Sequence, residues 1–207
     1  MALGFSTEAS TGGSKFLPVV KFDAKSGDMI CINREPGQKP GEWEKTEVEV
    51  ELPTKVVIDF ENLEVGWISF APTYSAVMVK AGDKFPAQPT PDHKQAVRAK
   101  VFFKEHGLRE FSPTSKTVLR VIDKLHDEYL AAADKNAGKM PVISINGTKP
   151  VKITTPQGEL RFKVPDMVIS GWTEAPAAFT EASAPVEQPK AKDKPAKQVQ
   201  ADDFEEF

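Results

Sequence analysis

Residues 98–104 alternate between basic or aromatic side chains and small or apolar ones. In an extended strand successive side chains point to opposite faces, so Arg98, Lys100, Phe102 and Lys104 share one face. Cations can follow the phosphates of a single-stranded nucleic acid, and a flat ring can stack on its bases. The pattern predicts a strand that binds nucleic acid. It equally fits a strand whose phenylalanine packs beneath a helix while its cations are solvated.

A turn at Glu105-His106-Gly107 separates this run from a second one that ends at Phe111. We expect a hairpin in which Arg109 and Phe111 extend the same surface. Other candidates lie on other predicted strands, and each is also explained by packing; Trp67 is expected mainly in the core, whereas Trp43 follows an exposed loop. The predicted strand-contacting residues are Arg98, Lys100, Phe102, Lys104, Arg109, Phe111, Trp43, Trp67, Tyr74, Lys80, Arg161 and Lys163.

The last six residues combine acids with aromatic rings. Four carboxylates surround Phe204 and Phe207, and the segment contains no base. Apolar rings in a tail without a core indicate a pocket on a partner, and the acids would pair with cations around that pocket. They can also mimic phosphates and occupy the protein's own basic groove. The predicted partner-binding residues are Asp202, Asp203, Phe204, Glu205, Glu206 and Phe207.

The net charge of -3 is distributed unevenly along the chain. Residues 174–207 contain eight acids and four lysines and so carry -4, which leaves +1 for residues 1–173. A weakly basic domain with an acidic tail does not conflict with nucleic-acid binding, because the local charge matters more than the sum.

The elements that must position these residues are mostly short strands. Runs of β-branched and aromatic residues recur between turn signals that are too short for helical crossovers, which predicts an antiparallel sheet. One segment has a helical period, with Val118, Val121, Ile122, Leu125, Tyr129 and Leu130 on one side. The expected fold is mostly β: an OB-like antiparallel β-barrel with one amphipathic α-helix. A β-sandwich with an added helix is the alternative.

Composition divides the chain into three parts. Residues 1–15 are rich in Ser, Thr and Gly and are expected to be flexible. Residues 16–173 form the predicted OB-like nucleic-acid-binding domain. Residues 174–207 are dominated by Ala, Pro, Glu, Lys and Gln, which predicts a disordered linker and an acidic protein-interaction tail.

The predicted barrel, the linker and the acidic end at Phe207 together resemble bacteriophage-type single-stranded DNA-binding proteins and, more loosely, their bacterial counterparts. The resemblance implies an OB-fold that coats and protects single-stranded DNA in replication, recombination or repair. It also implies a tail that recruits replication proteins such as DNA polymerase or helicase. Bacterial members end in an acidic run followed by Pro-Phe, so Phe204 and Glu206 depart from that pattern, which favours the phage type.

Other functions find little support in the residues. No phosphate-binding loop, nucleophile elbow or zinc spacing occurs, and His93, His106 and His126 are scattered, so we expect no enzyme, metal or cofactor. The single Cys31 and the absence of a signal-like segment predict a cytoplasmic protein, in the host cytoplasm if phage-encoded, without membrane insertion. The sequence allows a homo-oligomer without indicating one. The alternative function is a β-barrel interaction or structural module that binds no DNA and docks on a partner through its terminal phenylalanines.

Overall fold

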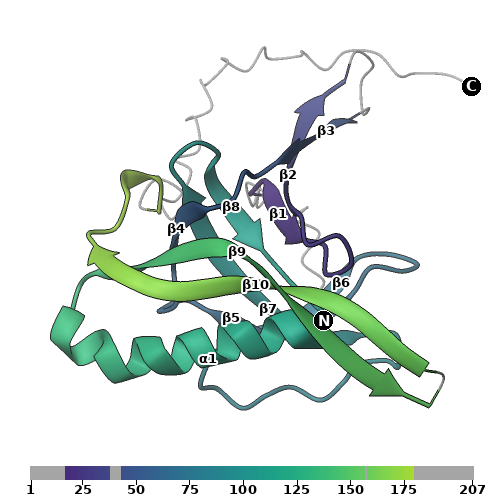
Figure 1. The fold of residues 1–207 in the computed structure, drawn as a ribbon. Coiled ribbons are helices and arrows are strands. Elements are labelled where there is room, and N and C mark those ends of the chain that lie inside the picture. Colours follow the sequence, from purple (N-terminus) through teal and green to yellow (C-terminus); the bar gives the residue numbers. More distant parts are fainter. Residues whose placement is uncertain (1–16, 38–42, 157, 180–207) are drawn as a thin grey trace, which may run out of the picture.

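The computed structural model describes residues 17–37, 43–156 and 158–179, and this part of the chain forms ten strands and one long helix (Figure 1). The elements are β1 Val19–Phe22, β2 Met29–Pro36, β3 Trp43–Glu49, β4 Thr54–Ile58, β5 Glu64–Ser69, β6 Ser75–Lys80, β7 Lys94–Phe103, β8 Gly107–Phe111, α1 Lys116–Ala133, the short 3-10 helix η1 Asp134–Asn136, β9 Met140–Thr155 and β10 Gly158–Thr173. The prediction of a mostly β domain with one amphipathic helix is confirmed.

The strands form one sheet in the order β10-β9-β4-β7-β8-β1-β2-β3, and β5 and β6 join it through β7. All pairs are antiparallel except β1 with β8. Within the described residues no ladder joins β3 to β10, so a closed barrel is not formed by strand pairing. One main-chain hydrogen bond does connect β10, at one end of this order, to the β1–β2 turn: Lys163 N–H donates to the Ala24 oxygen over 2.7 Å.

Strand β7 is the centre of the sheet. Its second half pairs with β8 on one edge and with β4 on the other, and its first half pairs with β5. Between β4 and β5 the chain turns at Asp59–Asn62, where Asn62 N–H donates to an Asp59 carboxylate oxygen over 3.0 Å. This turn places Phe60 and Leu63 in the core and lets β4 and β5 follow one edge of β7 in succession.

Helix α1 lies along one side of the sheet, next to β10 and β7 (Figure 1). Val118, Ile122 and Leu125 are buried, so the predicted helical period is confirmed for these residues. Leu130, predicted on the same side, is 56% exposed, because it lies near the end of the helix, beyond the core cluster. No helix in the described ranges is both long enough and apolar enough to cross a membrane.

Strands β9 and β10 form one long hairpin instead of the several short strands that the sequence predicts. The composition of Asn146-Gly147-Thr148 predicts a turn, but these residues lie inside β9. The glycine adopts φ of 146°, and a register shift follows in β10 between Pro165 and Met167. The turn prediction is wrong because the pairing of two 16-residue strands outweighs a local turn preference.

The main chains of β5 and β6 approach each other closely at Gly66. This predicts that alanine destabilises the domain more at Gly66 than at Gly171. A Cβ atom at Gly66 would collide with the Val77 main-chain oxygen and lie 2.9 Å from Met78 Cα, whereas at Gly171 it would meet no atom within 4 Å. We expect Gly66→Ala to lower the free energy of unfolding by about 1–3 kcal/mol through overpacking. Gly171→Ala, the matched control in β10, should change it by less than about 1 kcal/mol. Urea denaturation measures both, and equal effects would contradict the close packing.

Candidate nucleic-acid interface

Arg98 is the centre of a group of polar side chains on the face of β7 that points away from α1. Its guanidinium contacts Glu64 over 3.1 Å and Glu110 over 3.5 Å, and it donates to the Tyr74 hydroxyl over 2.8 Å. These partners come from β5, β8 and the turn before β6. One side chain of the central strand therefore connects three neighbouring segments of the sheet.

The charge of Arg98 is held by its surroundings. Partial burial lowers the pKa of the guanidinium, but the charges of Glu110 and Glu64 and the Tyr74 hydroxyl outweigh it and raise that pKa above its ordinary value. Two further cations lie beside the same acids by strand register, since Lys100 is opposite Glu110 and Lys80 is opposite Glu64. The surface is thus an alternation of bases and acids and not a purely basic strip.

Two exposed aromatic rings adjoin this group. Phe70 directly follows β5 and is 63% exposed, and Tyr74 directly precedes β6 and is 51% exposed. Their ring centroids are 5.9 Å apart with a tilt of 48°. We define the aromatic-basic patch as the residues that share this surface: Phe70, Tyr74, Lys80, Arg98 and Lys100, with the acids Glu64 and Glu110.

Phe70 was missed in the sequence. It continues the run of β5, and a large apolar residue at a strand end is normally assigned to the core. The signal that could have identified it is its position just before Ala71-Pro72, since proline ends the ladder and leaves the preceding side chain without a neighbouring strand to cover it.

Phe102 lies on the same face of β7 but is covered by the chain itself. The ring of Phe179 lies 6.4 Å from that of Phe102, and Phe179 is only 7% exposed. The predicted linker starts at Glu174, so Phe179 belongs to it. Its first residues, up to Phe179, therefore pack on the domain at this ring. Of the strand 98–104, only Lys104 is fully exposed at the end of the hairpin.

Arg109 and Phe111 do not extend this surface, and that part of the prediction is wrong. In the β7–β8 register Arg109 is opposite Val101 and Phe111 is opposite Ala99, all on the core face and all at most 5% exposed. The prediction placed both residues on the wrong face because strand register cannot be obtained from alternation within each strand. Arg109 Nε donates to the His106 oxygen over 3.0 Å, while its Nη1 has no hydrogen-bond partner.

The remaining predicted residues lie apart from the patch. Trp67 is half-buried on the face that α1 covers, where its indole N–H donates to the Pro86 oxygen over 2.8 Å. Trp43 is 65% exposed at the start of β3, in the hairpin that projects away from α1 (Figure 1). Arg161 and Lys163 are exposed on β10, and Lys163 Nζ donates to the Ser26 oxygen over 2.7 Å. The predicted partner-binding residues 202–207 lie outside the described residues.

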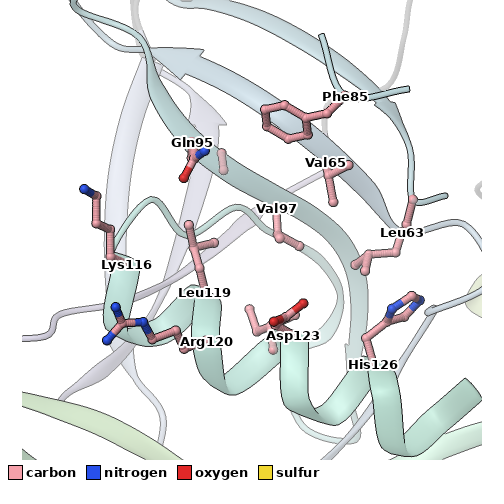
Figure 2. Close-up of a pocket in the computed structure, with 13 residues that line it drawn as sticks. Leu63, Val65, Phe85, Gln95, Val97, Lys116, Leu119, Arg120, Asp123 and His126 are labelled. Carbon is pink, nitrogen blue, oxygen red and sulfur yellow. The ribbon is translucent and has the colours of Figure 1, made fainter. Parts of the chain in front are cut away.

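The opposite face of β5 and β7 contributes to an open groove beside α1, with a volume of about 400 Å³ (Figure 2). Val65 and Val97 point into it from the strands, and Leu119 points into it from the helix. Phe85, from the segment between β6 and β7, closes one side. We call this the helix groove; its polar residues are Gln95, Lys116, Arg120, Asp123 and His126.

Comparisons with known proteins give no match: no family model fits the chain, and no curated protein or solved structure is significantly similar to it. The function of the patch is therefore inferred from its own residues and contacts.

Phe179 is buried and Phe70 is exposed, so substitution by alanine should affect stability differently at these two positions. Phe179→Ala should lower the free energy of unfolding by about 1–3 kcal/mol, because it uncovers Phe102 and removes a ring contact. Phe70→Ala should change it by less than about 0.5 kcal/mol. Urea denaturation of the full chain measures both values, and a destabilisation by Phe70→Ala as large as that by Phe179→Ala would show that Phe70 is structural.

Proposed function

We propose that this protein binds single-stranded DNA non-catalytically and independently of sequence, and coats and protects it in replication, recombination or repair. The observation that carries the proposal is the pair of exposed rings, Phe70 and Tyr74, held beside the Arg98 guanidinium. Rings offer stacking surfaces to any base, and adjacent cations neutralise phosphates, so the combination favours a single strand without base-edge readout. A duplex would hide its bases from such a surface.

The acids in the patch have a specific role in this proposal. Glu64 and Glu110 pair with Arg98, so the patch, with its three cations and two acids, carries a net charge of only +1. Phosphates must compete with them, which keeps binding moderate and dependent on salt. Lys100, Lys80 and Lys104 extend the surface on either side, and Arg161 and Lys163 supply further cations on β10.

We also propose that the domain is an incompletely closed barrel of the OB type. The turn at Asp59–Asn62 lets β4 and β5 pair in succession along one side of β7, and the hydrogen bond from Lys163 to Ala24 brings β10 to the β1–β2 turn. Both features bend the sheet toward closure. The acidic tail would then recruit replication proteins such as a polymerase or helicase through Phe204 and Phe207.

Charge reversal tests the cationic part of the patch. In fluorescence anisotropy with labelled oligo-dT, the double variant Lys100→Glu and Lys104→Glu should weaken binding and reduce the log-log salt slope by about 0.7 for each phosphate that the protein no longer neutralises. Lys124→Glu is the control, because Lys124 lies on the exposed side of α1 and, within the part of the chain that the structure describes, pairs with Glu128 alone. Unchanged affinity and slope in the double variant would refute the assignment.

Ring removal tests the stacking part. We expect Phe70→Ala and Tyr74→Ala each to weaken oligo-dT binding by about 1–3 kcal/mol. Phe85→Ala is the matched control, since Phe85 is 43% exposed but lies at the helix groove on the other face. If neither the wild type nor any variant binds oligo-dT at low salt, the proposal is wrong. The alternative function, an interaction module that docks on a partner through Phe204 and Phe207, then takes its place.

A further inference from the structure

The helix groove combines an apolar floor with cations at one end. Val65, Val97 and Leu119 line the floor, and Figure 2 shows Lys116 and Arg120 together at the end of the groove that lies near the start of α1. His126 and Leu63 lie at the other end. The volume of about 400 Å³ falls within the range of about 300–1,000 Å³ that is usual for binding pockets.

The cations of the groove have no acidic partner among the described residues. Lys116 and Arg120 take part in no ion pair there, although Arg98, Lys21 and Lys149 all do. Among the described residues that line the groove Asp123 is the one acid, so two positive charges face one negative charge there. The first turn of α1 contains no acid either, so the partial positive charge of the helix start adds to the local field.

We propose that the helix groove binds the terminal segment Asp202–Phe207 of the same chain. The segment matches the groove in both of its properties: Phe204 and Phe207 suit an apolar floor, and its four carboxylates suit Lys116 and Arg120. The aromatic-basic patch is the less suitable site for the same segment, because its central cation Arg98 is already paired with Glu64 and Glu110.

The length of the chain permits this contact. Phe179 is placed on the domain, and 22 residues, 180–201, lie between it and Asp202. An extended chain of that length spans up to about 80 Å, which exceeds the size of a domain of this kind. Attachment to the same chain also raises the local concentration of the segment to the order of millimolar, so even a weak intrinsic affinity suffices.

The location of the groove has a functional consequence. Val97 lines the groove while Arg98, the next residue, belongs to the patch, so the two surfaces lie on opposite faces of β7. A segment bound in the groove would be withheld from partner proteins without blocking the patch. Binding in the groove therefore controls whether the terminal segment is available to partner proteins, whether or not the patch binds DNA.

Site-specific photo-crosslinking of the full chain tests the inference. Phe207 is replaced by p-benzoylphenylalanine, the protein is irradiated, and the crosslinked peptides are identified by mass spectrometry. We expect a product of monomer mass with crosslinks to groove residues such as Phe85, Val97 and Leu119. The double variant Lys116→Glu and Arg120→Glu should reduce the yield about fivefold or more, since two attractions become repulsions.

Lys124→Glu is the matched control and should leave the yield unchanged, because Lys124 lies on the same helix but outside the groove. An acid at position 116, in the first turn, is favourable to the helix, and Arg120 is exposed in the second turn, so the double variant should remain folded, which circular dichroism checks. Crosslinks to Arg98 or Lys100, crosslinks only between two molecules, or no crosslink to the domain would each overturn the proposal.

Discussion

The pairing of β7 with three other strands is the constraint on which the rest of the structure depends. Because β4, β5 and β8 all bond to this one strand, its alternation is imposed on the whole centre of the sheet. Ala99, Val101 and Phe103 fill the core beneath α1, and Arg98, Lys100 and Phe102 point the other way. A slip of one residue would bury a row of cations, so the core itself enforces the register that exposes the patch.

The polar face of β7 is organised by the ion pairs of Arg98. Arg98 is partly buried, and a guanidinium in that position needs its acidic partners; Glu64 and Glu110 supply them and also fix the Tyr74 ring through the shared arginine. Ring orientation is therefore built into the domain before any ligand arrives. The same acids offset the positive charge of Arg98, so the aromatic surface is fixed in a region of mixed charge.

The aromatic-basic patch and the helix groove lie on opposite faces of β5 and β7, because successive side chains in a strand point to opposite faces of the sheet. The close approach at Gly66 holds β6 against β5 and so brings the Tyr74 turn over the outer face, while Val65 and Val97 remain on the side of the helix. Residues adjacent in the chain thus serve separate surfaces. Such a division allows a small sheet to present two different surfaces without overlap.

The sequence by itself determined the elements that local patterns encode: the mostly β composition, the amphipathic helix with Val118, Ile122 and Leu125 on its buried side, the β7–β8 hairpin, and the shared face of Arg98, Lys100 and Phe102. Those features follow from the periods of single segments. Only the tertiary structure decided that Arg109 and Phe111 enter the core, that Phe179 covers Phe102, and that the exposed Phe70 pairs with Tyr74. Each of these depends on register or on contacts between distant segments, and such contacts are set by the packing of the whole sheet and leave no periodic signal in the chain.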